Sequence, residues 1–431
     1  MKSGIIIISG ELLEKLVGEV GSNDISLLSV DGGDVYTMLQ EIYPQAGVPG
    51  SLYCATQPKQ IPVTAFGKPE DRVRLIAYRS ARMTKELQHA EPKDVTGYVL
   101  LGKEWESVPV QVVPVKGEIF SRSKGLLETD RLAGKRVSIF GLGSGGSPIA
   151  VELAKAGVMD FYLMDHDRLE VANVARHVAG ISHVGRYKTK VMADMIREKN
   201  PYARIHTWEE KVSFENHEVV REMVRKADVN VCATDSRPSR LIINRLCVEE
   251  NRPCVFAGAS RRAYGGQILR VRPYISPCYQ CFCSLLPEKA EDQEISRQEQ
   301  AENRAYSDRP VPIEPGLASD IAPISIMVVK IIINELLGDV KSTLHSLDKD
   351  LIAPWYLWLN RREPGTPYEK LKPMGYNVNV MSILRWYGID LRRHPGCPVC
   401  GDFEAHVAKE EGIEVPNSQC VLEPTEGEGI G

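Results

Sequence analysis

The sequence predicts an α/β protein built on a doubly wound, mostly parallel sheet (a Rossmann-like domain), with a separate small N-terminal domain and a C-terminal part held by zinc. Three observations carry this prediction. Apolar segments of strand length alternate with helical patterns between residues 131 and 275. A glycine-rich segment joins the first of these strands to its helix, and two C-x-x-C pairs stand far apart in the C-terminal half of the chain.

The composition excludes several classes of protein. The chain has 431 residues, of which 43% are hydrophobic and 26% charged, and its net charge is −4. This balance gives no electrostatic reason to expect nucleic acid or an anionic membrane as a partner. No stretch reaches the about 18 uninterrupted apolar residues of a membrane span, and Ile5–Ile8 is too short for the core of a signal peptide. We therefore expect a cytoplasmic protein.

Residues 1–120 are predicted to form a mixed α/β or β-rich domain. Short apolar runs between turn residues read as strands, at Ile5–Ile8, Val73–Ile76, Val99–Leu101 and Val110–Val115. His89 is the one histidine of this stretch, so a zinc hydrolase of the His/His/Asp kind cannot be assembled here. The absence of a catalytic constellation favours scaffolding or recognition and leaves the role of the domain open.

Residues 121–340 hold the predicted parallel sheet. Its strands are expected at Val137–Phe140, Phe161–Met164, Val229–Ala233, Cys254–Ala257 and Gln267–Val271, and the helix Ser147–Ala156 completes the first βαβ unit. Residues 287–313 read as an exposed, charged loop. The strongly apolar helix Ile321–Leu337, with Pro323 expected in its first turn, should lie buried against the sheet. Residues 341–431 mix short strands with aromatic residues, and the tail from Glu423 should be disordered.

The glycine-rich segment has the pattern of a phosphate-binding loop. Gly141, Gly143 and Gly146 stand between a strand and a helix, where free backbone N–H groups bind phosphate and a Cβ would prevent its close approach. Asp165 follows Gly146 by 19 residues and ends the second strand, where an acid reaches a ribose hydroxyl. Two other interpretations stay open, a glycine turn that serves packing alone and an NAD-dependent oxidoreductase.

Further polar residues favour ATP over a dinucleotide. Asn173, Arg176 and Lys188 follow the second strand, and Asp235 follows the strand Val229–Ala233. The carboxyl ends of parallel strands meet at one edge of a sheet, so these side chains should share a crevice. A guanidinium and an ammonium group suit a triphosphate, and a carboxylate suits Mg²⁺. Hydride transfer has no use for that set.

From about Arg122 to Leu337 the sequence resembles the ThiF/MoeB/HesA family, the adenylation domain of ubiquitin-activating enzymes. Five motifs match in family order, at residues 141–148, 165–176, 184–188, 200–201 and 233–235. The resemblance implies ATP-dependent adenylation of the C-terminal glycine of a ubiquitin-like or sulfur-carrier protein. A non-catalytic scaffold that has kept the fold is the remaining alternative.

The resemblance also implies roles for individual residues. It places Asp165 on the ribose with Asp167 in the same nucleotide site, and it places Mg²⁺ on Asp235. It also implies that Asn173, Arg176 and Lys188 bind the phosphates. Arg122 resembles a family arginine that reaches the ATP of a partner subunit, so a homodimer is expected. A conjugating enzyme would be a further partner if the activated protein is passed on.

The two C-x-x-C pairs have the spacing of a structural zinc site. Four thiolates close a tetrahedral Zn²⁺ and leave no position for chemistry. Such a site would pin the C-terminal stretch to the sheet domain, although a redox dithiol is the rival interpretation for one pair. The four ligands would be Cys278, Cys281, Cys397 and Cys400.

The transfer of an activated acceptor to a thiol has weaker support. Members of the resembled family that form a thioester carry a cysteine after the first zinc pair or just before the buried helix, whereas residues 284–396 contain no cysteine here. Cys283 and Cys420 are the remaining candidates for a reactive thiol.

Overall fold

The computed structural model describes residues 4–17, 21–41, 46–55, 61–78, 95–123, 125–127, 129–284, 316–338, 344, 347–375, 379–403 and 406–407, and all structural statements refer to these. The predicted loop 287–313, Cys420 and the tail from Glu423 lie outside the described residues.

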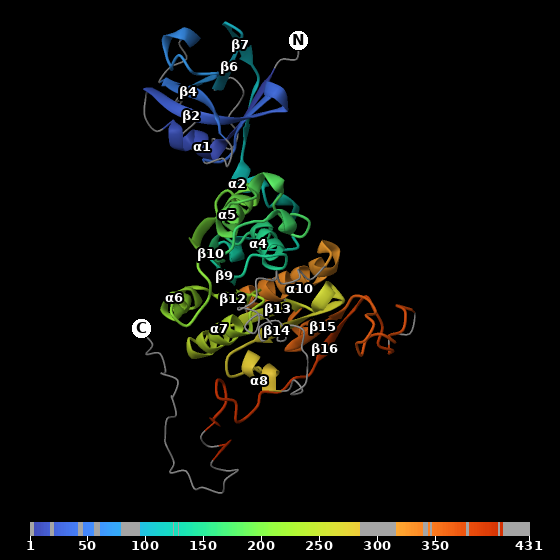
Figure 1. Cartoon of the computed structure of the whole chain (residues 1–431). Helices are drawn as coiled ribbons and strands as arrows, with labels where there is room; N and C mark the ends of the chain where they lie inside the picture. Colours follow the sequence, from blue (N-terminus) through green and yellow to red (C-terminus); the bar gives the residue numbers. More distant parts are fainter. Residues whose placement is uncertain are drawn as a thin grey trace, which may run out of the picture.

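The N-terminal part forms an eight-stranded mixed sheet with its own hydrophobic core (Figure 1). In the order β7-β6-β5-β4-β2-β3-β1-β8, β1 is parallel to β3 and β8, β4 is parallel to β5, and the other pairs are antiparallel. The strands are β1 (Ile5–Ser9), β2 (Gly21–Val30), β3 (Val35–Met38), β4 (Val48–Ala55), β5 (Val73–Tyr78), β6 (Val95–Leu101), β7 (Glu104–Val108) and β8 (Val110–Val113).

Two short helices border this sheet. Helix α1 (Gly10–Leu16) starts where the Ser9 hydroxyl accepts the Leu12 N–H, and it buries Leu13 in the core. The strand expected at Val110–Val115 ends at Val113, because Pro114 has no N–H for a ladder, and α2 (Val115–Glu118) begins directly after it.

The second sheet confirms the predicted doubly wound, mostly parallel architecture. In the order β11-β10-β9-β12-β13-β14-β15-β16, the first five strands are parallel and the last three join antiparallel. The strands are β9 (Arg136–Phe140), β10 (Asp160–Met164), β11 (Arg204–Trp208), β12 (Val229–Cys232), β13 (Cys254–Ala259), β14 (Gly265–Val271), β15 (Trp355–Leu359) and β16 (Arg385–Ile389).

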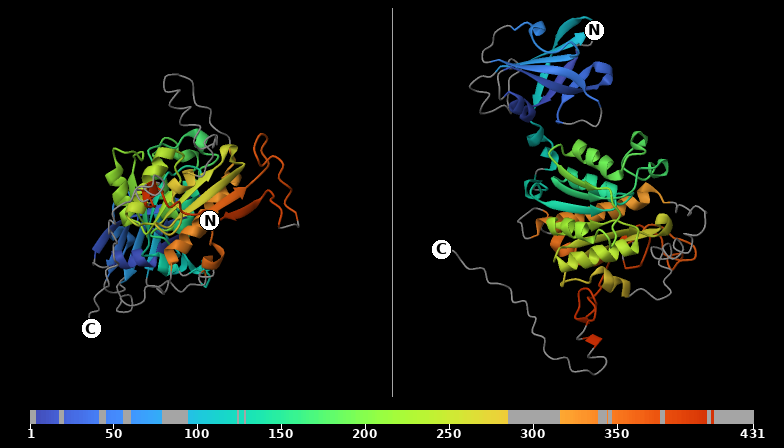
Figure 2. Two further views of the ribbon diagram at one scale, coloured as in Figure 1. Left: turned by 90° about the horizontal axis from the view of Figure 1, so that it is seen from below. Right: turned by 60° about the vertical axis from the view of Figure 1, so that its left-hand side comes forward.

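Helices cover both faces of this sheet (Figures 1 and 2). One core cluster joins the sheet to α4 (Gly146–Lys155), α5 (Lys188–Lys199) and α10 (Ala318–Leu337). The other joins it to α6 (His217–Lys226), α7 (Arg237–Glu249) and α8 (Tyr279–Ser284). Side chains alternate between the clusters along a strand, as Phe161 and Tyr162 do on β10. Two four-residue helices, α3 (Thr129–Leu132) and α11 (Leu347–Asp350), complete the described helices.

Helix α10 is longer than the sequence predicted. It begins at Ala318, so Pro323 is its sixth residue and not part of the first turn. The helix continues through Pro323 although this residue has no N–H to donate to the preceding turn. None of the helices in the described part of the chain has the length and hydropathy of a membrane-spanning segment.

The C-terminal part continues the sheet directly. β15 pairs with β14, and β16 pairs with β15, where the rings of Trp358 and Trp386 pack 5.4 Å apart. The sheet itself therefore joins the C-terminal part to the rest of the domain, and a zinc ion at the four cysteines would add a second link between them.

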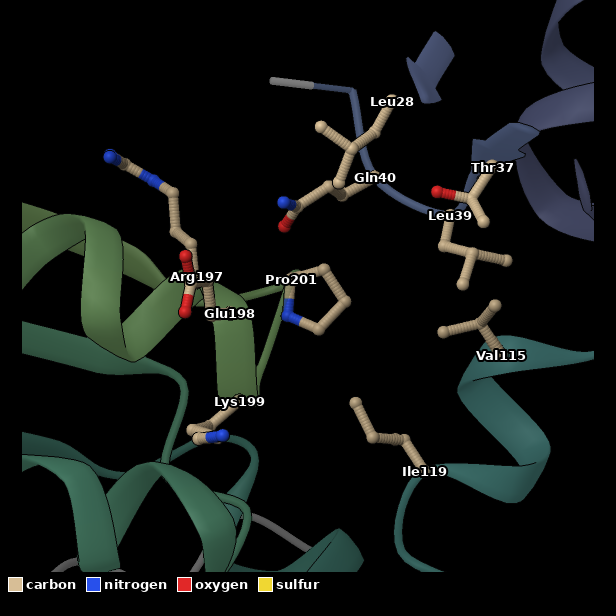
Figure 3. A pocket seen from close by; sticks show the side chains of 10 residues that line it. All are labelled: Leu28, Thr37, Leu39, Gln40, Val115, Ile119, Arg197, Glu198, Lys199 and Pro201. Atoms are coloured by element: carbon tan, nitrogen blue, oxygen red, sulfur yellow. The ribbon is translucent and has the colours of Figure 1, made fainter. Parts of the chain in front are cut away.

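A cavity of about 360 Å³ lies between the N-terminal sheet and α5 (Figure 3). Apolar side chains of β2, α2 and the segment after β3 line one side, and the end of α5 with Pro201 lines the other. Next to this region, burial and the carboxylate of Glu11 raise the pKa of Tyr202 to about 12. The N-terminal sheet thus contacts the loop that follows α5.

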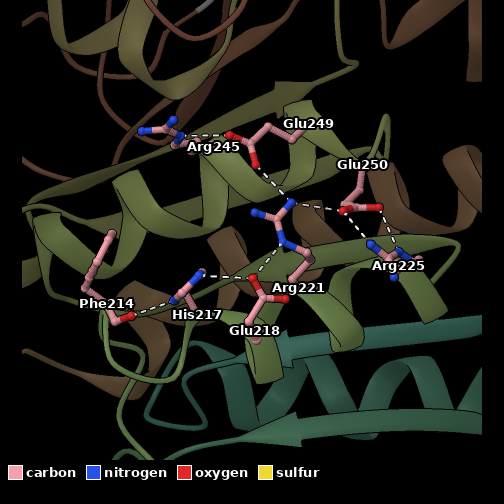
Figure 4. A network of polar contacts seen from close by, with 8 residues as sticks. All are labelled: Phe214, His217, Glu218, Arg221, Arg225, Arg245, Glu249 and Glu250. Atoms are coloured by element: carbon pink, nitrogen blue, oxygen red, sulfur yellow. Dashed lines mark hydrogen bonds and ion pairs between the residues drawn. The ribbon is translucent and has the colours of Figure 1, made fainter.

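Helices α6 and α7 are joined by ion pairs at the surface (Figure 4). Glu250, just after α7, accepts from Arg221 at 3.0 Å and from Arg225 at 2.9 Å. These two guanidinium groups, Arg225 first, lower the pKa of Glu250 to about 2. The network holds the two helices that cover one face of the sheet next to β12.

Candidate active site

The candidate site lies at the carboxyl ends of β9 and β12. From β9 the chain crosses to β10 on one side, and β12 pairs with β9 on the other. A crevice forms in parallel sheets where the strand order reverses in this way. The glycine loop follows β9 and Thr234–Asp235 follows β12, so both segments lie at the same edge of the sheet.

The three glycines of the loop have different structural tasks. Gly141 has a φ of +88°, and a Cβ there would lie 2.8 Å from the Ala233 carbonyl oxygen. A Cβ on Gly146 would overlap the Gly141 carbonyl oxygen. These two glycines are required for packing. Gly143 faces open space, with no heavy atom within 4 Å of a built Cβ, so it is the position a phosphate could approach closely.

Two side chains hold the peptide groups of Leu142, within the glycine loop. Its N–H donates to Asp165 Oδ2 at 2.7 Å, and its carbonyl oxygen lies 3.0 Å from His177 Nε2. Asp165 is buried, and its second oxygen accepts the Asp167 N–H at 2.8 Å. Each carboxylate oxygen has a further lone pair, so the expected ribose contact is compatible with this loop-holding role.

His177 is fixed in one neutral tautomer. Its Nδ1 accepts the Ala179 N–H at 3.0 Å, so Nε2 carries the proton that is donated to Leu142. Burial lowers the pKa of His177, and the nearby charge of Lys188 acts in the same direction. Sequence analysis assigned no role to His177, although it stands next to Arg176 in a matching motif.

Lys188 and Asp167 form an ion pair next to Asp165. Lys188 Nζ lies 2.7 Å from Asp167 Oδ2, with the lysine side chain 10% and the aspartate side chain 49% exposed. Burial acts to raise the pKa of Asp167, but the hydrogen bond and charge of Lys188 outweigh it, so this pKa is lowered. Lys188 is also the first residue of α5, whose N-terminus favours anions.

Asn173 and Arg176 lie in the segment after β10. The side-chain oxygen of Asn173 accepts the Glu170 N–H at 3.0 Å and forms part of a capping box. Arg176 is half-buried and reaches the start of α10, where its Nη1 lies 3.9 Å from the Cβ position of Gly316. Ser325 of α10 also donates to the Gly145 carbonyl oxygen at 3.1 Å. Helix α10 thus borders the crevice.

Asp235 is exposed and directly precedes α7, whose N-cap is Ser236. Its segment packs against the glycine loop, because a Cβ on Gly141 would lie 3.0 Å from Thr234 N. A carboxylate here can face a metal bound beside phosphates. Asp165, His166 and Asp167 also have ligand atoms within 4.8 Å of one another, and each Asp165 oxygen already accepts one backbone N–H group.

The four predicted metal ligands come together as a buried cluster. All four Sγ atoms lie within 4.8 Å of one another, with separations of 3.9, 3.7 and 3.4 Å for the pairs Cys278–Cys281, Cys278–Cys397 and Cys281–Cys400. A tetrahedral zinc with Zn–S bonds of about 2.3 Å places sulfurs about 3.8 Å apart. Hydrogen bonds from Cys278, Cys400 and the His394 N–H lower the pKa of Cys281. The geometry fits a closed metal site.

The remaining predicted residues do not join the crevice in the described structure. Arg122 is exposed in a short 3-10 turn, Ser121–Ser123, before β9. Cys283 is 7% exposed in α8, within the core cluster that contains the four metal-ligand candidates. A reaction at Cys283 would therefore require α8 to move away from this core.

Comparisons with known proteins identify the family of the chain. The sequence pattern of the ThiF family matches residues 118–354. The sulfur carrier protein ThiS adenylyltransferase of Escherichia coli (strain K12) is 30% identical over 277 residues, which cover 64% of this chain and 89% of that protein. The adenylyltransferase and sulfurtransferase MOCS3-2 of Zea mays is 32% identical over 172 residues, 38% of this chain and 34% of that protein.

The chain thus spans about a third of the length of the maize relative. Among solved structures, Escherichia coli MccB with ATP is 19% identical with a TM-score of 0.45, covering 64% of this chain and 69% of that one. The family match extends over more than half of the chain and includes the glycine loop, the Lys188 segment and the first cysteine pair. The chain belongs to the ThiF family.

Proposed function

We propose that the protein adenylates the C-terminal glycine carboxylate of a ubiquitin-like or sulfur-carrier protein with ATP. The observation that carries the proposal is the glycine loop with the segments around it: Gly143 is open, Asp165 holds the Leu142 N–H and the Asp167 N–H, and Asp167 pairs with Lys188. The Thr234 segment packs against Gly141 on the other side of the loop. The name of the Escherichia coli relative, an adenylyltransferase of the sulfur carrier protein ThiS, gives the class of acceptor.

Different residues bind different parts of the ATP molecule. In this proposal the open side of Gly143 and the N-terminus of α4 receive phosphate, and Asp165 accepts a ribose hydroxyl. Lys188 and Arg176 neutralise the phosphates, with Asn173 beside them. Asp235 would hold Mg²⁺, which supplies further positive charge to the triphosphate.

The reaction needs alignment and charge neutralisation more than proton transfer. A carboxylate oxygen of the acceptor attacks the α-phosphorus, the bond to the bridging oxygen breaks, and pyrophosphate leaves with that electron pair. The acceptor carboxylate is already ionised at neutral pH, so no base is required. Two anions must approach each other, so cations held by the chain lower the barrier.

The assembly and the later steps are part of the same proposal. The four cysteines would hold structural Zn²⁺. Arg122 would serve the ATP of a second copy in a homodimer. Release of the acyl-adenylate to a sulfur donor or to the thiol of a conjugating enzyme fits better than transfer to Cys283, because that thiol is buried. A cytoplasmic location would supply ATP and keep the zinc-binding thiols reduced.

Ligand protection tests the nucleotide assignment. ATP with Mg²⁺ at about a hundredfold its Kd should stabilise the protein by about 2.7 kcal/mol, and NAD should give no shift of Tm. Asp235→Ala should lose the magnesium-dependent part of the shift, whereas Asp390→Ala, at a side chain that is 79% exposed, should keep it. Protection by NAD and none by ATP would favour the oxidoreductase, and protection by neither would favour a scaffold.

A further inference from the structure

We propose that Arg240 is a positioning residue for the Thr234–Asp235 peptide and connects it to the four-cysteine cluster. The inference deepens the proposed function and rests on it, since Asp235 matters here as the ligand of Mg²⁺. Arg240 lies on α7, one turn after the N-cap Ser236, and it is only 4% exposed.

The guanidinium of Arg240 donates hydrogen bonds to two backbone carbonyl groups near the ends of β12 and β13. The pairing of β12 with β13 ends at Cys232 and Phe256. Beyond that pair, Arg240 Nε donates to the Thr234 carbonyl oxygen at 2.9 Å, and Nη2 donates to the Ala257 carbonyl oxygen at 2.7 Å. Buried carbonyl groups need donors, so Arg240 replaces the missing ladder contacts.

This contact sets the position of Asp235. The Thr234 carbonyl belongs to the same peptide unit as the Asp235 N–H, so a planar group links the guanidinium to the backbone of the acid. The same segment touches the glycine loop, where Gly141 allows the approach. Arg240 therefore fixes the position of the Asp235 backbone relative to the phosphate-binding loop.

Arg240 also contacts the turn that carries the first cysteine pair. The ring of Tyr279 lies with its centroid 5.8 Å from Arg240 Cζ, and Tyr279 stands between Cys278 and Cys281. The Tyr279 N–H donates to Asn244 Oδ1 at 2.8 Å. Asn244 lies four residues after Arg240, on the same face of α7. One helix face therefore contacts both the segment of Asp235 and the metal-ligand turn.

A role in stability alone makes a different prediction. Burying a guanidinium is costly, and its donors could serve only to complete the sheet. In that case a substitution would lower the Tm but leave the response of ATP binding to Mg²⁺ unchanged. A positioning role changes that response in the folded protein.

The experiment uses the full chain and a fluorescent ATP analogue, titrated without Mg²⁺ and with saturating Mg²⁺. In the unsubstituted protein, Mg²⁺ should tighten binding. In Arg240→Met this gain should fall by about tenfold, because small displacements of a binding group cost this much or more. Zinc content and binding without Mg²⁺ should stay unchanged. Arg240→Lys, which keeps one charged donor group, should lie between the two.

Matched variants separate the outcomes. Arg245→Met, on the same helix with a side chain that is 72% exposed, should behave like the unsubstituted protein. Tyr279→Leu should reduce the magnesium gain while zinc remains bound. An unchanged gain in folded Arg240→Met overturns the proposal, as does an unchanged gain in Arg240→Lys if the methionine variant does not fold. An unchanged gain in Tyr279→Leu overturns the link to the cluster. Absence of ATP binding in the unsubstituted protein refutes the proposed function instead.

Discussion

Replacing His177 by phenylalanine tests whether the glycine loop is held by side chains. Phenylalanine keeps a flat aromatic ring, which is one atom larger, and lacks both nitrogens, so the Leu142 carbonyl and the Ala179 N–H lose their partners. Each buried polar group left without a hydrogen bond costs about 1–3 kcal/mol. We therefore expect a loss of about 2–6 kcal/mol in unfolding free energy, together with weaker protection by ATP.

Urea unfolding followed by tryptophan fluorescence measures this loss, because the second sheet contains Trp208, Trp355, Trp358 and Trp386, four of the five tryptophans of the chain. His217→Phe is the matched control. Its histidine is partly exposed beside Glu218, so the change should stay within about 0.5 kcal/mol. Equal stability of His177→Phe and the unsubstituted protein would refute the loop-holding role.

The same pair of proteins predicts a pH dependence. The pKa of His177 is lowered in the folded state, so the unfolded chain binds more protons as the pH falls below about 6.5. The contribution of neutral His177 to the unfolding free energy is complete above that pH and is lost as the pH falls toward the folded-state pKa. The stability difference between the unsubstituted protein and His177→Phe should therefore shrink in acid. A difference that grows in acid would contradict the neutral tautomer.

Three further predictions follow from the structure. Gly146→Ala should displace the loop and abolish protection by ATP, because its Cβ would overlap the Gly141 carbonyl oxygen. Gly143→Ala should fold normally and weaken only ATP binding, because its Cβ would face open space. Thermal shifts with and without ATP distinguish the two variants. Cys400→Ser should lose bound zinc in elemental analysis and lower stability by several kcal/mol, and full zinc content would speak against the ligand set. Glu250→Gln should lower the unfolding free energy at neutral pH. Because the pKa of Glu250 is lowered to about 2, the stability difference between the two proteins should fade as the pH drops from 4.5 toward 2. Unfolding of both proteins measured across this pH range checks the prediction.

The parts of the fold that the sequence predicted are those with a local signal. The strands Val137–Phe140 and Phe161–Met164 are apolar on both sides because helices cover both faces, and the glycines mark the turn between them. The four cysteines were predicted from spacing alone, since few other arrangements use two such pairs.

What the sequence could not show depends on contacts between distant segments. Strand β11, with half-exposed residues such as Ile205 and Thr207 at the sheet edge, has no continuous apolar run to reveal it. The pairing of β15 with β14 joins segments more than eighty residues apart. The roles of His177 and Arg240 were missed for the same reason. Each side chain binds backbone groups outside its own helix or loop, and a contact of this kind has no sequence signature.

The central claim is that the crevice adenylates a glycine carboxylate. Exchange of labelled pyrophosphate into ATP, with and without a small sulfur-carrier protein that ends in glycine, measures that reaction directly. The account predicts exchange that requires both Mg²⁺ and the acceptor. It also predicts that Asp235→Ala abolishes exchange while the Tm without ligand stays unchanged. Exchange that persists in Asp235→Ala, or an acceptor that binds without supporting any exchange in the unsubstituted protein, would contradict it.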